Sequence, residues 1–306
     1  MTKEKALLLI IILVILLPGC GSKAVPANTR TLSLSEEVDE SMGVISDTIV
    51  DVFSQAHIQS IRISQALLNQ RIKILDEKDI WVKVEIEDGS IGWVKSRFVE
   101  RGVSKTAVGD YAYRVLVTSK AAAIYSQPSG GVTVKEVVMG SEFNALVKKE
   151  GSYEVMLPGG TTGWLSQSDT IQLSFGGPIP KTSAFDFVVT LEKFKGTSYL
   201  QGGISFRGID YAGLTYICAM VNGVNLPRSA GEQLNSGSPV SRDELRPGDL
   251  VFFGTAEDAG EVDDITVYIG NGKYIHSNRT KGYVTVESFD EEYFAEKLLG
   301  IRRIFQ

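Results

Sequence analysis

Two segments in the first half of the chain repeat the same order of apolar runs and turns. In each copy a Ser-Gln pair precedes an apolar alternation, and a Gly-Trp pair follows it. Gln55 and Gly92 lie 37 positions apart in the first copy, and Gln127 and Gly163 lie 36 apart in the second. Period-two apolar runs separated by Gly, Pro and Asp turns are typical of antiparallel strands. The repeat therefore predicts two small barrels, over residues 44–103 and 111–173.

The last part of the chain, residues 181–306, shows helical patterns first and strand patterns after them. Thr182 or Ser183 is expected to cap a first helix. The apolar stripe expected on that helix consists of Phe185, Val188, Val189 and Phe194. A short helix is expected after Pro227-Arg228. Strands are expected near 249–253, 265–269, 273–277, 284–288 and 299–305, which gives an α+β domain with an antiparallel sheet.

A Gly-flanked turn, Gly208 to Gly213, leads into the apolar sequence of a central helix. This helix is expected from about residue 211 to residue 222 and should end at Gly223, a residue type that suits the position after a helix. The first turn of a helix offers unpaired N–H groups and a positive dipole end, which favour a thiolate or a developing oxyanion. The turn is therefore the place where a nucleophile would be expected.

Five phrases in the last third of the chain resemble, in order, those of the NlpC-type cell-wall peptidases, which are papain-like cysteine enzymes. They are Gly196–Gly203, Gly208–Leu214, Asn225–Arg228, Leu245–Phe253 and Val267–Ser277. The two repeats likewise resemble bacterial SH3-like domains, which commonly precede such domains. The resemblance implies a mostly β N-terminal half of two SH3-like barrels and a papain-like C-terminal domain that acts on peptidoglycan stem peptides. Fold alone does not carry the activity, so the site needs its own argument.

The resemblance places the three catalytic positions of the family at Tyr211, Asp264 and His276. The family has Cys at the first position and His at the second, so only the third is kept. A phenol has a pKa near 10 and a carboxyl group one near 4, so Asp264 is a poor base for Tyr211 by about six units. In a comparable triad, loss of the nucleophile or the base costs on the order of 10⁶ in kcat. No active catalytic residue is therefore expected.

Four further residues are expected to bind substrate or ligand by the same resemblance: Asp210, Ala212, Gln201 and Arg228. Asp210 faces the free amine of the stem peptide in relatives, but it is equally a candidate helix N-cap. Ala212 stands where the family has Ser, and Gln201 where it has Trp. The first barrel is expected to help wall the site, through residues that the sequence leaves open: Glu85, Glu87, Tyr111 or Tyr113.

No residue of this sequence is a strong candidate to replace the missing catalytic Cys and His of the family. Cys218 lies two helical turns past Tyr211 within an apolar run, where a free Cys usually acts as a small hydrophobic side chain. His57 belongs to a different domain, so a metal site around Tyr211, Asp264 and His276 is not expected. Nor is a cofactor. We expect instead that His276 pairs with Asp264 and that Tyr211 caps the former cleft.

The N-terminus, residues 1–20, reads as a lipoprotein signal peptide. Lys3 and Lys5 precede 12 apolar residues, too few for a membrane span of about 20. The run ends in Leu-Pro-Gly-Cys, which resembles a lipobox with Cys20 as the lipidated residue; a simple cleaved signal with an incidental Cys is the alternative. Residues 21–43 are polar and read as a tether. The chain is then expected at the cell envelope, exported across the inner membrane and anchored by lipid.

Charge and composition exclude one class of partner. The net charge is −6 and no basic-aromatic stripe occurs, so nucleic-acid binding is not expected. The main hypothesis is a catalytically inactive homologue of a γ-D-glutamyl-diamino acid endopeptidase, a pseudoenzyme that binds a cell-wall peptide (muropeptide) or an envelope protein. The alternatives are a structural adaptor that binds through the SH3-like pair and an active cell-wall hydrolase with an atypical site.

Overall fold

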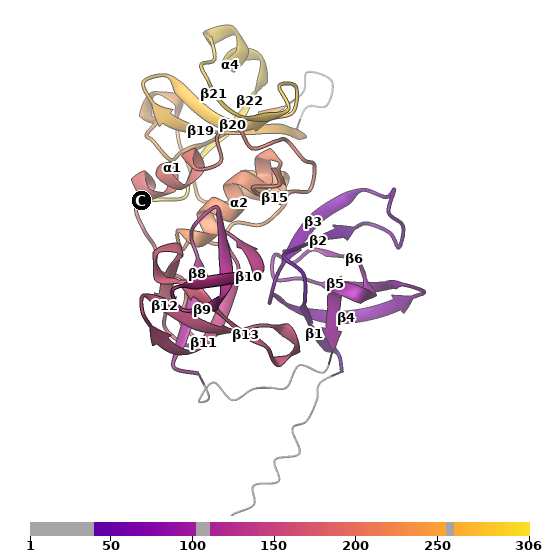
Figure 1. The fold of residues 1–306 in the computed structure, drawn as a ribbon. Helices are drawn as coiled ribbons and strands as arrows, with labels where there is room; N and C mark the ends of the chain where they lie inside the picture. The colour runs from indigo at the N-terminus through magenta and orange to yellow at the C-terminus, as the bar shows by residue number, and fades with distance from the viewer. Residues whose placement is uncertain (1–39, 102–110, 255–259) are drawn as a thin grey trace, which may run out of the picture. The chain divides into compact units, whose positions relative to one another are not determined.

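The computed structural model describes residues 40–101, 111–254 and 260–306 of the 306-residue chain (Figure 1). All of them belong to one structural unit. The expected signal peptide with Cys20 and nearly all of the expected tether lie outside the described residues. Within the described ranges, no helix has the length and apolar character needed to cross a membrane.

The first repeat forms a seven-stranded antiparallel sheet in the order β3-β2-β6-β5-β4-β1-β7. Its strands are β1 (Met42–Ile45), β2 (Ile49–Phe53), β3 (Arg62–Leu67), β4 (Arg71–Lys78), β5 (Trp81–Glu85), β6 (Ile91–Lys95) and β7 (Val99–Arg101), with the short helix η1 (Ser96–Phe98) between the last two. Inward-facing side chains such as Val52, Val84 and Val94 fill its core without exposure to solvent. This core explains the alternating pattern read from the sequence.

The second repeat forms another seven-stranded sheet in the order β10-β9-β13-β12-β11-β8-β14. Its strands are β8 (Tyr113–Val117), β9 (Ala121–Gln127), β10 (Gly130–Val138), β11 (Glu142–Lys149), β12 (Ser152–Met156), β13 (Thr162–Ser166) and β14 (Thr170–Leu173), with the short helices η3 (Pro158–Gly160) and η4 (Gln167–Asp169). At each place in this order stands the strand of the second repeat that corresponds to the strand at the same place in the first sheet. The internal repeat is therefore confirmed at the level of topology.

The C-terminal part places helices before an antiparallel sheet, as expected. The helices are α1 (Ala184–Glu192), α2 (Tyr211–Val221), α3 (Ala230–Leu234) and the later α4 (Glu291–Lys297), with η5 (Arg242–Glu244). The sheet has the order β17-β22-β18-β19-β20-β21 and consists of β17 (Ser238–Pro239), β18 (Leu250–Gly254), β19 (Val262–Gly270), β20 (Lys273–Asn278), β21 (Tyr283–Glu287) and β22 (Leu298–Arg303). A small hairpin, β15 (Ile204–Ser205) and β16 (Gly208–Ile209), precedes α2. Helix α4 was not expected.

Helix α1 begins where the sequence indicated but turns a different face to the core. Ser183 is its N-cap and forms a reciprocal capping box with Asp186. The expected stripe is wrong in part, because Phe185 is 72% exposed. The helix instead buries Phe187, whose ring stacks on Phe305 with centroids 5.0 Å apart. The sequence is compatible with burial of either the Phe185 face or the Phe187 face of the helix. The contact with Phe305, near the C-terminal end of the chain, selects the Phe187 face.

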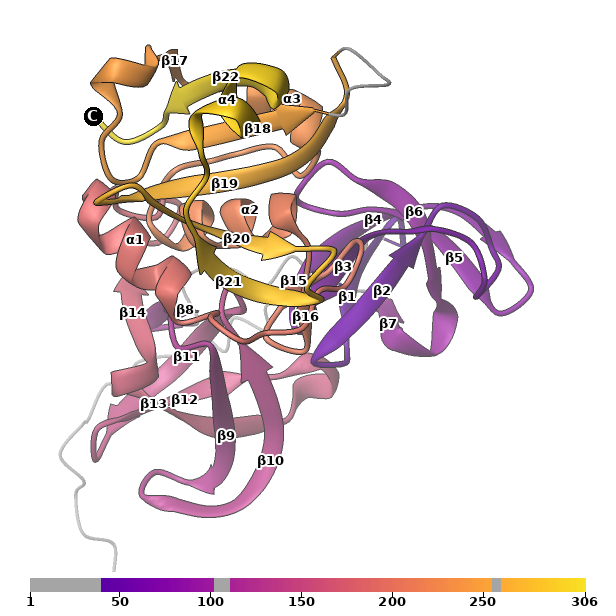
Figure 2. The same ribbon diagram turned by 90° about the horizontal axis from the view of Figure 1, so that it is seen from above.

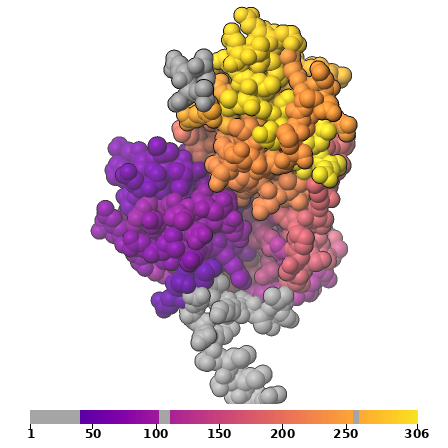
Figure 3. Space-filling model, turned by 180° about the vertical axis from the view of Figure 1, so that it is seen from behind, coloured from indigo at the N-terminus to yellow at the C-terminus, as the bar shows by residue number. Residues whose placement is uncertain are grey.

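Helix α2 is buried on nearly every side, as its uniformly apolar sequence requires. It packs against α1 and against strands β19 and β20 of the sheet (Figure 2). Leu67 of the first barrel and Leu116 of the second join the same apolar core. Figure 3 shows atoms of the first barrel adjoining those of the C-terminal domain. The start of α2 is therefore fixed from several directions.

The face of α1 that is buried supplies a test of the fold. Phe187→Ala should lower the free energy of unfolding by about 3–5 kcal/mol, because it empties a packed aromatic site. Phe185→Ala, the matched control two positions earlier, should change it by less than about 0.5 kcal/mol. Chemical unfolding followed by far-ultraviolet circular dichroism measures both. Equal losses of unfolding free energy for the two variants would contradict the burial of Phe187 and the exposure of Phe185.

Candidate functional site

The turn before α2 depends on glycines that allow a close backbone approach. A Cβ on Gly213 would lie 2.1 Å from the carbonyl oxygen of Gly203, and one on Gly203 would lie 2.3 Å from that of Gly208. Neither position accommodates a side chain without moving backbone atoms. Because these contacts bring residues 203–208 against the first turn of α2, they set where Asp210 and Tyr211 lie.

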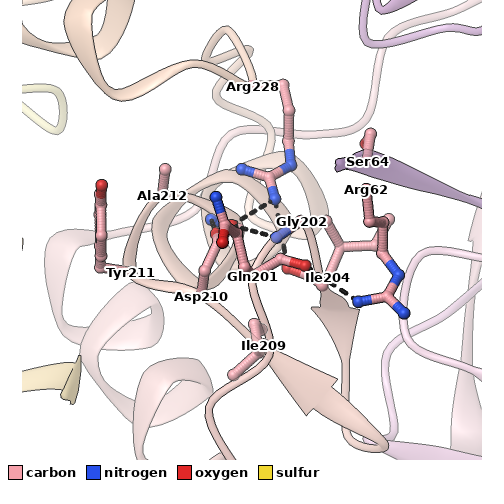
Figure 4. Close-up of polar contacts among 12 residues, drawn as sticks. Arg62, Ser64, Gln201, Gly202, Ile204, Ile209, Asp210, Tyr211, Ala212 and Arg228 are labelled. Carbon is pink, nitrogen blue, oxygen red and sulfur yellow. Dashed lines mark hydrogen bonds and ion pairs between the residues drawn. The ribbon is translucent and has the colours of Figure 1, made fainter. Parts of the chain in front are cut away.

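Asp210 caps α2 and also holds the surrounding loops. Its Oδ1 accepts from the backbone N–H of Gly213 at 2.6 Å, which confirms the N-cap role. Its Oδ2 accepts from the N–H of Gly202 at 2.7 Å and from Nη2 of Arg228 at 2.8 Å (Figure 4). Asp210 and Arg228 are only 8% and 7% exposed. Both carboxylate oxygens are therefore engaged within the protein, and the second expected role, contact with a ligand amine, stays a prediction.

Tyr211 is the first residue of α2 and lies to one side of the Asp210–Arg228 pair (Figure 4). Its ring is half-buried, and its hydroxyl donates a long hydrogen bond of 3.5 Å to the carbonyl oxygen of Val262. Burial, followed by the neighbouring Tyr199 hydroxyl, raises the pKa of Tyr211 to about 12. At neutral pH the phenol is thus protonated and a poor nucleophile.

Asp264 and His276 face each other across neighbouring strands, as expected. His276 Nδ1 lies 2.5 Å from Asp264 Oδ2, and the imidazole is 1% exposed. The sequence did not reveal the third member, Glu287, whose Oε2 lies 3.0 Å from His276 Nε2. Thr285 pairs with His276 and Glu287 lies two residues further on the same face, so Glu287 is identified only once the register of β20 with β21 is known.

The imidazole between two carboxylates favours its protonated form, in which both nitrogens donate. Burial acts against the charge, but the hydrogen bonds and negative charges of Asp264 and Glu287 outweigh it and raise the pKa of His276. Burial also acts against the ionised Glu287, yet its contacts with Lys281 and His276 lower the pKa of that carboxyl group. In the part of the chain that the structure describes, no hydrogen bond joins this cluster to the hydroxyl of Tyr211.

A cleft of about 440 Å³ opens beside the start of α2. Its walls include all four predicted ligand-binding residues, together with Tyr211: Gln201, Asp210, Ala212 and Arg228. Tyr211 is one of the lining residues and its hydroxyl contacts the carbonyl oxygen of Val262, so the expectation that it caps the former cleft stays a prediction. Asp264 and His276 are not among the lining residues. The structure thus brings the four ligand positions together and leaves the His276 cluster outside the cleft.

The first barrel does wall the cleft, but through residues other than those proposed. Its contributions are Ile63, Asp88, Gly89 and Ser90. Glu85, Glu87, Tyr111 and Tyr113 do not line it. Asp88 lies in the turn between β5 and β6, where its carboxylate accepts from the Ser64 hydroxyl at 2.6 Å and from the Ser90 N–H at 2.7 Å. The sequence prediction chose these side chains by residue type. The turn between β5 and β6 instead decides which side chain of the first barrel reaches the cleft.

Cys218 does not serve the cleft. The residue has no exposed surface, and burial raises the pKa of its thiol well above the usual value. The thiolate, which is the reactive form of cysteine, is therefore strongly disfavoured. Among the described residues, no group of three or more His, Cys, Asp or Glu side chains is arranged to hold a metal ion.

Comparisons with known proteins agree with this architecture. Residues 196–303 match the NlpC/P60 family, and residues 50–100 match the bacterial SH3 domain. A γ-D-glutamyl-L-lysine dipeptidyl-peptidase of Bacillus cereus is 31% identical over 248 residues, which cover 78% of this chain and 74% of that protein. The protein of the same name from Bacillus subtilis is 28% identical over 275 residues, covering 87% of this chain and 85% of its own length.

A solved structure shows the same fold over most of the chain. The crystal structure of an NlpC/P60 family protein from Bacillus cereus superposes with a TM-score of 0.78 and 26% sequence identity. The match covers 87% of this chain and all of that one. The β-rich N-terminal half with SH3-like antiparallel sheets and the papain-like C-terminal domain are therefore both confirmed.

The raised pKa of His276 predicts how stability depends on pH. A group whose pKa is raised on folding contributes stability that is fully present below its unfolded pKa, near 6.5, and is lost as pH rises through the folded pKa. The melting temperature should therefore fall over that window, and His276→Gln should flatten the fall. His57→Gln, at an exposed position, is the control and should leave it unchanged. An unaltered pH profile in His276→Gln would contradict the charged cluster.

Proposed function

Because this chain belongs to the NlpC/P60 family, we propose that it is a non-cutting member that binds a peptidoglycan stem peptide in the cleft beside α2. The observation that carries the proposal is the tyrosine at the start of α2, where the family resemblance expects the nucleophilic cysteine. The cleft supports binding, since it is open and lined by the start of α2 and by residues of the first barrel. The relatives are peptidases by name, which supports a peptide ligand.

The chemistry of the site supports the absence of cutting. With a pKa of about 12, Tyr211 would be ionised in about one molecule in 10⁵ at pH 7. A base could assist it, but the imidazole of His276 has both nitrogens within hydrogen-bond distance of carboxylates and is 1% exposed. A general base must reach the proton that it removes. No step of nucleophilic attack can therefore be assigned to these side chains.

One backbone N–H group at the start of α2 is taken up by the helix cap. In an acyl-transfer enzyme, backbone N–H groups near the nucleophile stabilise the developing negative oxygen. Here the N–H of Gly213 already donates to Asp210 at 2.6 Å. The buried thiol of Cys218 supplies no alternative nucleophile. The cap of α2 thus uses one N–H group that could otherwise face a developing oxyanion.

The proposal predicts binding without turnover. A synthetic peptide with a γ-D-glutamyl-L-lysine bond should bind the full chain saturably in calorimetry, and mass spectrometry should find it intact after prolonged incubation. Gln201→Ala should weaken binding by about tenfold, because it removes an exposed polar side chain from the cleft wall. Gln59→Ala, an exposed glutamine of the first barrel outside the cleft, is the matched control.

Two results would overturn this function in different ways. Turnover that Tyr211→Phe abolishes would establish a working hydrolase with an atypical site. Binding that survives Gln201→Ala unchanged and requires residues of the SH3-like pair away from the cleft would establish a structural adaptor. The first result concerns turnover and the second concerns where the peptide binds, so each result identifies one of the two alternative functions.

The location proposed for this binding is the cell envelope, with the chain held by lipid at Cys20. The support is the sequence alone: two lysines, 12 apolar residues and a Leu-Pro-Gly-Cys ending. Two or three acyl chains give durable anchoring, whereas one is marginal. Metabolic labelling with palmitate should mark the wild-type protein and not the Cys20→Ala variant. Equal labelling of the two would refute the anchor.

A further inference from the structure

A second cavity, of about 590 Å³, lies where both barrels meet the C-terminal domain. The first barrel contributes the β3–β4 turn and Glu87, the second contributes the β10–β11 turn, and α2 contributes Tyr216 and Ile217. The cavity and the cleft share Asp88 as their one common lining residue among those described. Its size lies within the range of small-molecule sites, about 300–1,000 Å³.

Glu87, like Asp88, is an acid on the cavity wall that has no salt bridge among the described residues. Its neighbour Glu142 is paired with Arg114, with Oε2 and Nη2 2.8 Å apart, whereas no salt bridge reaches Glu87 in the described part of the chain. The side chain of Glu87 is exposed by surface area, although many protein atoms surround its carboxyl group. The desolvation that these atoms cause, followed by the charge of Glu142, raises the pKa of Glu87, while a hydrogen bond with Gln70 and the charges of Arg114 and Arg71 act in the opposite direction.

Two hydroxyl groups on the cavity wall have no hydrogen-bond partner among the described residues. Ser141 is 1% exposed, and its Oγ is buried without a partner. Tyr216 is 7% exposed, and no described residue forms a hydrogen bond with its hydroxyl. Burial, followed by the charges of Asp88 and Glu87, raises the pKa of Tyr216, so its hydroxyl stays neutral. A buried polar group without a partner is costly, by about 1–3 kcal/mol, unless water or a ligand satisfies it.

The rest of the wall is partly apolar. Leu67, Leu116, Ile217 and Met220 line it. Gly140 keeps the space between the second barrel and α2 narrow, because a Cβ there would lie 2.6 Å from Cδ1 of Ile217. Its φ of +91° also disfavours any other residue. A ligand in this cavity would therefore meet both hydrocarbon and polar groups on the cavity wall.

We propose that this cavity binds a small organic molecule with one protonated amine and an apolar body. An ammonium group has three N–H donors and no acceptor. Glu87, Tyr216 and Ser141 supply three acceptor groups, one of them negatively charged. The hydrocarbon of the ligand would lie against Leu116 and Ile217. This site does not depend on the proposed function, because the cavity and the stem-peptide cleft have only Asp88 in common among their described lining residues.

The probe for this site is n-butylamine, which is fully protonated at neutral pH. Calorimetry or ligand-detected NMR with the full chain should show saturable binding. Glu87→Gln should weaken it by about tenfold or more, because it removes a charged hydrogen-bond acceptor, and Tyr216→Phe should weaken it several-fold. Glu85→Gln is the matched control, since Glu85 lies outside the cavity, with its Oε2 3.8 Å from Nζ of Lys73. It should bind as the wild type does.

Two further probes, one neutral and one negatively charged, test whether the cavity prefers a positively charged ligand. Butanol should bind more weakly than n-butylamine, and butyrate should not compete with it. Equal affinity of Glu87→Gln and wild type, preference for butyrate, which would point to Arg71 at the cavity, or no saturable binding of n-butylamine would each overturn the proposal. Glu87→Gln should not lower the melting temperature, because it removes a desolvated charge, so a loss of binding is not a loss of folding.

Discussion

The start of α2 depends on one buried carboxylate. Asp210 accepts hydrogen bonds from the first turn of its own helix, from the Gly202 loop and from Arg228, which follows the helix in sequence. Breaking a buried ion pair by removing one partner typically costs about 3–5 kcal/mol, because the other charge is left without compensation. Arg228 also has an Nε with no partner in the described structure, so it has little else to balance its charge. The loops that form the cleft therefore share one electrostatic centre.

Much of the fold was predictable because its signals are local. The repeat of turns and alternating residues indicated two barrels, and their identical strand orders confirm it. The start and end of α2 followed from Asp210 and Gly223. The face of α1 was not predictable, since Phe185 and Phe187 each begin an apolar stripe. Only the stacking of Phe187 on Phe305, far away in sequence, decides between them.

The site shows the same division between local and distant information. The resemblance identified the helix start and also placed Asp264 and His276 near each other. The roles of Asp88 and Glu287 depend on which turn reaches the cleft and on the register of β20 with β21. Both are long-range properties of the folded chain. A carboxylate two residues beyond the partner of His276 is recognisable only after the strands are paired.

The polar residues around the site have structural partners, so under the proposed function the reaction can be absent without loss of the fold. The cap of α2 is Asp210, so a tyrosine at residue 211, where the resemblance expects a cysteine, leaves the cap intact. At residue 264, where the resemblance expects a histidine, the carboxylate of an aspartate is the partner of His276. The new pair is itself favourable, since the neighbouring carboxylates raise the pKa of the imidazole despite its burial. Under the proposed function, the two substitutions remove the reaction while preserving the helix start and the sheet around it.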